Sequence, residues 1–307
     1  MKIEESTYHI PALLDETIQS LDIKPSGVYA DATFGGGGHS RAIISKLGPH
    51  GRLFGFDRDI DALQNRIHDS RFTFVHSDFR FLTNFLRFHN AEKIDGLVAD
   101  LGVSSHHFDD AERGFSFRAD SPLDMRMNRQ GTLTAATILN QYSETELARI
   151  LNIYGEVKRP MPIVKAIITK RNAGGILTTG ELVEVLKPLI DPRQEKKDLA
   201  RIFQALRIEV NGELDSLRHL LAALPKALRP GARAAIITYH SLEDRLVKNF
   251  FRSGNFAGEI EKDFFGRVQC DWSPVGKQPI VPTEEEVEVN PRARSAKLRT
   301  AEFTPRL

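Results

Sequence analysis

The feature that most constrains the fold is a run of four glycines, residues 35–38, which lies between Asp31 and Ser40. An apolar run at residues 28–30 predicts a strand before the glycines, and residues 41–47 have apolar side chains at helical spacing. Strand, glycine turn and helix form the start of a βαβ unit. Residues without a Cβ let a ligand lie against the backbone, and the following helix presents free N–H groups there.

A second apolar run, residues 52–56, ends at Asp57. This acid follows Gly37 by about 20 residues, the spacing at which a carboxylate accepts hydrogen bonds from ribose hydroxyls. The glycines alone would equally predict a tight turn. Together with Asp57, they favour a site for a nucleoside cofactor.

Charge and spacing discriminate between the nucleoside cofactors. A dinucleotide fingerprint would place its third glycine at position 40, which is Ser40, and Asp31 would repel a pyrophosphate. S-adenosylmethionine carries a sulfonium and an ammonium, so an acid before the turn favours it over NAD. An NAD-dependent oxidoreductase is further disfavoured because no catalytic Tyr–Lys pair is evident.

Composition limits the class of protein. The chain of 307 residues has 41% hydrophobic and 27% charged residues, which is typical of a globular protein of about two domains. Its formal net charge of +1 excludes a global basic field, and its one cysteine, Cys270, excludes an internal disulfide and a cysteine-based zinc site. Neither a signal peptide nor an apolar run long enough to cross a bilayer is evident, so we expect a cytoplasmic protein without membrane contact.

The order of the predicted elements indicates an α/β fold. Further strands are predicted at residues 72–76, 94–101 and 231–239, with helices between them, and this alternation predicts a doubly wound parallel sheet. The ligand crevice of such a sheet lies at the carboxyl ends of its strands. Asp31, Asp57, Phe79 and Asp100 all fall at that edge.

A helical segment interrupts this pattern. No strand is evident between about residues 105 and 197, and Ser143 with Glu146 and Thr178 with Glu181 form predicted capping boxes. We predict a discontinuous domain of residues 1–105 and 198–307, and an all-helical insertion of residues 106–197. Residues 199–224 are expected to form one long core-packing helix, and residues 8–22 a lead-in helix. The last fifty or so residues are expected to be irregular or to form short antiparallel strands.

Two other stretches invite a functional interpretation. His106 and His107 are adjacent and lack a second cluster at ligand spacing, so no metal site is predicted. Ser241 lacks the flanking glycines of a nucleophile elbow and is better explained, with Asp244, as a capping box, while His240 faces the predicted crevice.

Two further stretches suggest contact with nucleic acid. The loop with Arg113 and Phe115 has the side chains that stack on RNA bases, or it is a packed loop. Arg292 and Arg294 belong to a basic patch that can contact phosphates, or to a solvated tail neutralised by residues 284–286.

Several stretches together resemble one family, the bacterial cytosine-N4 methyltransferases of small-subunit ribosomal RNA (the MraW or RsmH family). They run nearly end to end in family order: residues 8–14, 31–40, 56–59, 95–105, 109–117, 122–127, 203–213, 240–247 and 290–299. The resemblance implies a Rossmann-like class I S-adenosylmethionine methyltransferase domain with an inserted helical substrate domain. It implies methylation of the exocyclic N4 amine of a specific cytidine by direct in-line transfer, with small-subunit ribosomal RNA as partner, either free or in an assembling subunit. A non-catalytic S-adenosylmethionine- or RNA-binding module is the alternative, and a homodimer is one candidate assembly.

The resemblance also implies roles for individual residues. The positions that match the family's cofactor contacts are Gly37, Gly38, His39, Asp57, Phe79 and Asp100. Where family members have Ser-Ser-Pro-Gln, this chain has Ser-Ser-His-His. The glutamine contacts the cofactor in the family, so the resemblance implies that His107 makes this contact here. We expect Asp100 to be catalytic and to line the cytosine pocket with its loop through Ser104. Arg113, Phe115 and His240 are expected to hold the base, and Arg292 and Arg294 to contact phosphate.

Overall fold

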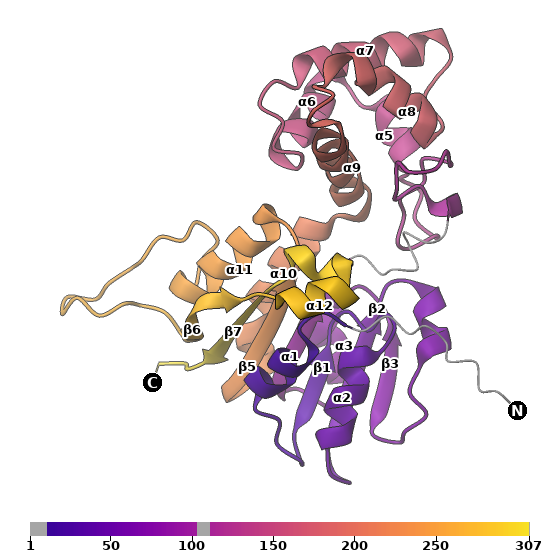
Figure 1. Ribbon diagram of the computed structural model, residues 1–307. Helices are drawn as coiled ribbons and strands as arrows, with labels where there is room; N and C mark the ends of the chain where they lie inside the picture. The colour runs from indigo at the N-terminus through magenta and orange to yellow at the C-terminus, as the bar shows by residue number, and fades with distance from the viewer. Residues whose placement is uncertain (1–10, 103–110, 307) are drawn as a thin grey trace, which may run out of the picture. The chain divides into compact units, whose positions relative to one another are not determined.

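A seven-stranded sheet with the order β3-β2-β1-β4-β5-β7-β6 organises one part of the molecule (Figure 1). The computed structural model describes residues 11–102 and 111–306. The strands are β1 (Val28–Asp31), β2 (Arg52–Asp57), β3 (Phe72–His76), β4 (Ile94–Asp100), β5 (Leu228–Thr238), β6 (Trp272–Ile280) and β7 (Lys297–Phe303). Neighbours among β1 to β5 are parallel, whereas β7 runs antiparallel to both β5 and β6. The predicted parallel sheet is therefore confirmed, with an antiparallel edge added by the C-terminal segment.

The chain divides into two compact units, residues 1–102 with 214–307 and residues 103–213. The first unit contains the sheet. Its helices are α1 (Leu14–Leu21), α2 (Gly38–Lys46), α3 (Leu82–Phe88), α10 (Glu213–Ala227), α11 (Ser241–Ser253) and α12 (Glu284–Val289), with 3-10 turns η1 (Ile60–Asn65), η2 (Phe79–Phe81) and η5 (Pro291–Ser295). The first residue of α10, Glu213, belongs to the other unit.

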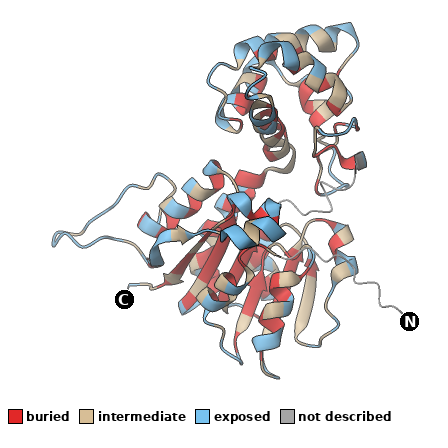
Figure 2. Cartoon of the chain, viewed as in Figure 1, coloured by how far each residue is buried: buried red, intermediate tan, exposed pale blue. Residues whose placement is uncertain are grey.

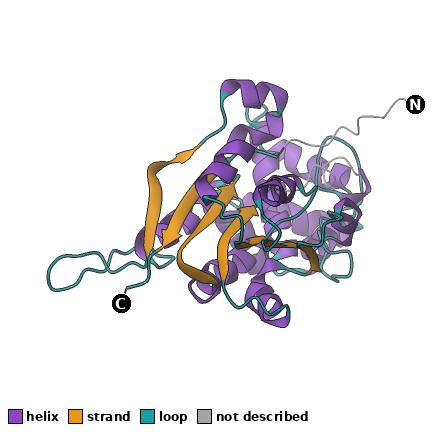
Figure 3. Cartoon of the chain, turned by 90° about the horizontal axis from the view of Figure 1, so that it is seen from below, coloured by secondary structure: helices purple, strands orange, loops and turns teal. Residues whose placement is uncertain are grey.

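The core of the sheet unit lies between the strands and their covering helices, and the central strands are almost wholly buried (Figure 2). Leu21 of α1, Ile43 of α2, Val98 of β4 and Ile237 of β5 pack in one cluster and are at most 1% exposed. Figure 3 shows the strands of this unit side by side in one sheet layer. Because this layer is fixed by apolar packing, the carboxyl ends of β1, β2 and β4 form a rigid edge that can position polar side chains.

The second unit is helical. It contains α5 (Ala135–Gln141), α6 (Glu144–Ile153), α7 (Met161–Ala173), α8 (Thr179–Leu186) and α9 (Glu195–Asn211), with 3-10 turns η3 (Ala111–Arg113) and η4 (Lys187–Leu189). Its described residues contain no strand, only an isolated bridge between Pro122 and Thr178. The capping boxes predicted at Ser143 and Thr178 are confirmed. A buried apolar cluster that includes Ile150, Val164, Leu182 and Leu206 is its core.

The single helix predicted over residues 199–224 is wrong. The helix breaks at Gly212, whose φ of +57° is left-handed and costs glycine little, so that α9 ends and α10 begins there. α9 packs against α5 and α6, and the helical unit consequently extends to Glu213 rather than to residue 197. The amphipathic period continues through the break because both helices bury an apolar stripe, and period alone does not reveal where one helix ends and the next begins.

Three smaller expectations also differ. The lead-in helix is confined to Leu14–Leu21 among described residues, and the helix expected between the strands at residues 52–56 and 72–76 is the 3-10 turn η1. The capping box at α11 is formed by His240 and Glu243 instead of Ser241 and Asp244. No helix in the part of the chain that the structure describes is long and apolar enough to cross a membrane.

Candidate cofactor site and active site

The glycine turn is tied to the end of the neighbouring strand. The Asp57 carboxylate accepts a hydrogen bond from the Gly35 N–H at 2.8 Å through one oxygen and from the Asp59 N–H at 2.8 Å through the other. The Phe34 N–H donates to the Phe56 carbonyl at 2.8 Å. These bonds fix the turn after β1 and the acid after β2 as one rigid element, which orients the carboxylate for a polar ligand.

The glycines of the turn have different surroundings. A Cβ on Gly37 would lie 2.7 Å from the Arg41 guanidinium, at a φ of +78°, and one on Gly38 would collide with the Pro11 ring. A Cβ on Gly36 would meet no atom within 4 Å, and one on Gly35 would meet only a carbonyl at 3.9 Å. The first two glycines therefore border open space in the described structure, and the last two permit close packing at the start of α2.

A buried polar cluster lies behind this turn. Asp31 is 2% exposed and accepts hydrogen bonds from the Ser40 hydroxyl at 2.7 Å and the Thr33 N–H at 3.0 Å. Burial raises the pKa of this carboxyl, and the nearby His39 ring opposes the shift. The Nε2 atom of His39 is buried and has no hydrogen-bond partner among residues 11–102 and 111–306. A buried acid beside an unsatisfied ring nitrogen fits a ligand that brings both positive charge and a polar group.

Phe79 stands at the end of the third strand. Its ring is 6% exposed, and the Arg58 guanidinium lies 6.0 Å from the ring centre. Asp78 begins this turn by accepting a hydrogen bond from the Arg80 N–H at 2.8 Å, and its other oxygen accepts from Ser216 at 2.9 Å. Phe79 is thereby held at the strand edge, where an aromatic face suits a planar base.

Asp100 ends β4 and is partly exposed. Its N–H donates to the Thr33 hydroxyl at 2.6 Å, and its Oδ1 accepts from the Gly102 N–H at 3.1 Å. The structure thus brings Asp31, Asp57, Phe79 and Asp100 to the carboxyl ends of parallel strands. The hydroxyl of Thr33 links the glycine turn to the acid of β4.

His240 has a structural function that the sequence analysis missed. It is the N-cap of α11: its Nδ1 accepts from the Glu243 N–H at 3.4 Å, and its Nε2 lies 3.1 Å from Glu243 Oε1. Despite this proximity, Nε2 is buried and makes no hydrogen bond among the described residues. A contact with substrate stays a prediction.

The two arginines of the basic patch lie in η5 and are exposed. Arg292 and Arg294 flank Ala293, which is fully buried and anchors the turn. This geometry presents both side chains to solvent, as phosphate contact requires. Their role stays a prediction.

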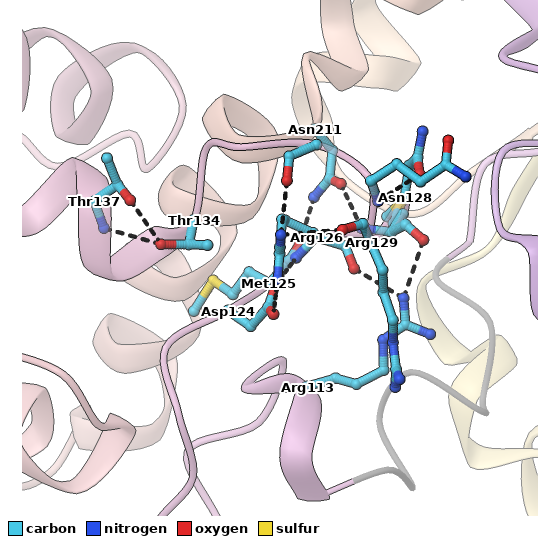
Figure 4. Close-up of polar contacts among 12 residues, drawn as sticks. Arg113, Asp124, Met125, Arg126, Asn128, Arg129, Thr134, Thr137 and Asn211 are labelled. Carbon is cyan, nitrogen blue, oxygen red and sulfur yellow. Dashed lines mark hydrogen bonds and ion pairs between the residues drawn. The ribbon is translucent and has the colours of Figure 1, made fainter.

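Arg113 and Phe115 are buried within the helical unit at 3% and 6% exposure. The Arg113 guanidinium donates to the carbonyls of Arg126 at 2.8 Å and Met127 at 3.0 Å (Figure 4), and it lies 5.8 Å from the Phe115 ring centre. Asn211 holds the same loop through the Met125 carbonyl and the Met127 N–H, both at 2.8 Å. Burial and internal bonds give both residues a packing function, and the expectation that they hold the base stays a prediction.

Two predicted residues lie outside the described residues. Ser104 and His107 belong to residues 103–110, so the cytosine-pocket loop and the substitution of the family's glutamine stay predictions. Sequence reasoning also assigned no role to Thr33 and Tyr239, although both follow strands at the predicted edge. The available signal was their position within two residues of the ends of β1 and β5.

Strand order 3-2-1-4-5-7-6 with β7 alone reversed, a glycine turn after β1 and an acid ending β2 define a Rossmann-like class I methyltransferase domain. The family model of the MraW methylase family matches residues 6–304. The chain therefore belongs to the MraW methylase family, as its sequence predicted.

Relatives support this membership. The chain is 56% identical over 302 residues to "Ribosomal RNA small subunit methyltransferase H" of Bacteroides thetaiotaomicron, covering 98% of this chain and 99% of the relative. It is 51% identical to the protein of the same name from Flavobacterium johnsoniae, covering 96% and 97%. A solved rRNA methylase from Streptococcus thermophilus aligns with 99% of this chain and 100% of its own, at 12% identity and a TM-score of 0.41. The predicted fold class and the use of S-adenosylmethionine are confirmed.

Proposed function

We propose that this protein transfers the methyl group of S-adenosylmethionine to the exocyclic N4 amine of a cytidine in small-subunit ribosomal RNA. Support for the RNA comes from the names of its relatives, and support for the amine comes from the family resemblance of its motifs. The main observation that supports the proposal is the hydrogen bond between Asp57 and Gly35, because it joins the proposed ribose-binding acid to a glycine turn that borders open space.

The cofactor contacts follow from the edge of the sheet. Gly37 and Gly38 shape the turn, and His39 offers its unsatisfied Nε2. Asp57 accepts from the ribose, Phe79 packs on the adenine, and Asp100 lies beside the reacting end, with His107 as the proposed replacement for glutamine. When bound, S-adenosylmethionine supplies a methyl group that its sulfonium already activates for transfer.

The remaining task of the protein is to prepare the nucleophile. The lone pair of a cytosine amine is shared with the ring, so attack requires partial rehybridisation. The Asp100 carboxylate would accept a hydrogen bond from this amine and hold nitrogen, carbon and sulfur in line. Positioning of reactants can lower a barrier by about 7–11 kcal/mol, so a fixed carboxylate is the main requirement.

Substrate contacts are proposed for four further residues. Ser104 would line the cytosine pocket and His240 would pack against the base, while Arg292 and Arg294 would bind phosphates. The helical unit, residues 103–213, would bind flanking RNA, and the target base would be extruded from structured RNA. We infer that the substrate is the assembled or assembling small subunit in the cytoplasm, because a net charge of +1 leaves little general attraction for naked RNA. A homodimer is part of the same proposal.

The test uses methyl-labelled S-adenosylmethionine and small subunits that lack the modification. The RNA is digested to nucleosides and the label is located by chromatography, with Asp57→Ala beside the wild type and naked RNA beside the subunits. We expect the wild type to incorporate label into N4-methylcytidine and the Asp57→Ala variant to incorporate none. Label in another nucleoside would refute the proposed amine, and cofactor binding without label in any RNA would identify a non-catalytic module.

A further inference from the structure

Two side chains, in addition to Asp57, hold the glycine turn after β1. Arg41 of α2 donates from Nη1 to the Gly36 carbonyl at 2.5 Å. Asn65, the last residue of η1, donates from Nδ2 to the Gly35 carbonyl at 3.1 Å. Two successive carbonyls of the turn therefore each accept a hydrogen bond from a side chain, and the two side chains come from different elements.

The two donors are joined to each other and to the end of β2. Arg41 donates from Nη2 to the Asn65 carbonyl at 2.9 Å. η1 begins after its N-cap Asp59, whose own N–H donates to Asp57 Oδ1 at 2.8 Å. The other oxygen of Asp57 accepts from the Gly35 N–H. These hydrogen bonds, with the short chain of η1, close a ring around the glycine turn.

This ring fixes two peptide planes. The Gly35 carbonyl and the Gly36 N–H belong to one planar peptide unit and point in opposite directions. The Gly36 carbonyl is related in the same way to the Gly37 N–H, which donates to the Phe34 carbonyl at 2.7 Å. Because both carbonyls are held, the directions of both N–H groups are held as well, and the Gly36 N–H is turned away from Asn65.

Packing contributes little to the order of the turn at Gly36. This glycine is exposed, and a Cβ on it would meet no atom within 4 Å in the described structure. A glycine backbone rotates more freely than that of any other residue, so the bonds from Arg41 and Asn65 supply the order that packing does not. A segment that is ordered before its ligand arrives lowers the entropy that binding costs.

We propose that Arg41 and Asn65 are positioning residues for the cofactor: by binding the Gly36 and Gly35 carbonyls, they keep the glycine turn in the conformation that receives S-adenosylmethionine. Both act through the backbone of the turn and not through a contact of their own with the ligand. The inference rests on the proposed cofactor site, and it adds two residues to those that the glycine motif indicates.

The first test is calorimetric titration of the full chain with S-adenosylmethionine. Arg41→Ala and Asn65→Leu each remove a donor, and leucine nearly keeps the shape of asparagine without adding charge. Each variant should raise the Kd by about 5- to 10-fold, the loss expected for one hydrogen bond. An unchanged Kd in either variant would overturn the proposal.

The matched control is Arg66→Ala. Arg66 is the exposed arginine next to Asn65, and its side chain makes no hydrogen bond or ion pair with residues 11–102 or 111–306. The Kd of Arg66→Ala should stay within twofold of the wild type, and a loss equal to that of Arg41→Ala would overturn the proposal because it would reflect charge alone.

Arg41→Lys separates geometry from charge. The planar guanidinium carries several donors in fixed directions and bridges the carbonyls of Gly36 and Asn65, whereas an ammonium is a single point charge. Arg41→Lys should therefore raise the Kd at least twofold, and wild-type affinity in this variant would overturn the proposal.

Steady-state kinetics distinguishes positioning of the cofactor from a general loss of structure. The turn contacts the cofactor alike before and during transfer, so Arg41→Ala should raise the KM for S-adenosylmethionine by about 5- to 10-fold and change kcat less than twofold. A fall in kcat at an unchanged KM would overturn the proposal.

The order of the turn is measured without ligand, by nitrogen-15 relaxation of the Gly36 and Gly37 amides. Arg41→Ala should lower their order parameters and Arg66→Ala should not, and equal order in Arg41→Ala and wild type would overturn the proposal. This arm needs neither cofactor nor RNA. Failure of the proposed cofactor site would instead appear as wild-type amide signals of residues 35–38 that do not shift with S-adenosylmethionine, and failure of the proposed function as a wild type that forms no N4-methylcytidine.

Discussion

The carboxylate of Asp57 accepts a hydrogen bond from the backbone N–H of Gly35 at 2.8 Å, across 22 residues of sequence. One side chain therefore serves two purposes: it offers oxygens at the end of β2 and it holds the glycine turn after β1. A change at Asp57 should consequently affect both ligand contact and the shape of the turn.

The first prediction concerns this acid. Asp57→Ala should weaken S-adenosylmethionine binding by about 10- to 100-fold, since hydrogen bonds to a charged group contribute about 1.5–3 kcal/mol. Isothermal titration calorimetry measures the change. Asp69→Ala is the control, because Asp69 is bonded to Arg71 at 2.6 Å on another part of the same unit and should leave affinity unaltered. Equal affinities for Asp57→Ala and wild type would refute the assignment of the ribose site.

The second prediction separates two adjacent glycines. Gly36→Ala should keep the wild-type melting temperature, because its Cβ meets no atom within 4 Å, but it should weaken cofactor binding, because that space is the proposed ligand site. Gly37→Ala should lower the melting temperature as well, since it adds a Cβ 2.7 Å from Arg41 at a φ of +78°. Thermal unfolding and calorimetry on the same samples check both. If Gly36→Ala bound the cofactor normally, the ligand would lie elsewhere.

The third prediction is a pH dependence of stability from Asp31. Burial raises its pKa above 3.8 in the folded protein, so the native state keeps a proton that the unfolded chain has already released. The contribution of Asp31 to the free energy of unfolding therefore decreases as pH rises from about 3.8 to the pKa of Asp31 in the folded protein. Above that pKa the contribution is constant. In Asp31→Asn the loss is absent, so its melting temperature relative to wild type should rise across this window. A relative melting temperature that falls with rising pH would show that the folded protein stabilises the ionised carboxylate.

The fourth prediction concerns the packing function of Arg113. Arg113→Ala leaves the buried carbonyls of Arg126 and Met127 without their donor, which should destabilise the helical unit by about 1–3 kcal/mol. Chemical denaturation, with hydrogen exchange at residues 125–127, measures the effect. Exposed Arg118 provides the comparison, and Arg118→Ala should change stability by less than about 0.5 kcal/mol. Full stability of Arg113→Ala together with lost RNA affinity would favour the base-holding function over the packing function.

The fifth prediction tests His240, whose ring caps α11 and is proposed to contact the base. His240→Asn keeps an N-cap acceptor and should preserve the melting temperature, while kcat falls by about 10-fold if the ring packs on cytosine. His240→Ala should lower both. Methyl transfer and RNA affinity that stay at wild-type values in His240→Ala would remove the residue from the active site.

The sheet and its functional edge could be predicted from sequence because their signals are local. Alternating apolar strands and helices imply a parallel sheet, and Asp31, Asp57 and Asp100 each end a recognisable strand. The same local signals failed at Gly212, where one amphipathic period covers two helices, and at α11, where Ser241 and His240 are both capable caps. Arg113 and Phe115 look like a base-stacking loop in sequence, since composition does not distinguish an exposed guanidinium from a buried one.

Sequence by itself determined which residues terminate the strands, the order in which strands and helices alternate, and the family. Only the tertiary structure decided which of these residues share hydrogen bonds: Asp57 with Gly35, Asp100 with Thr33, and Asp31 with Ser40. The reason is that strand periodicity is a property of neighbours in the chain, whereas a hydrogen bond depends on which strands become neighbours in the sheet. That pairing is fixed by the packing of the whole core.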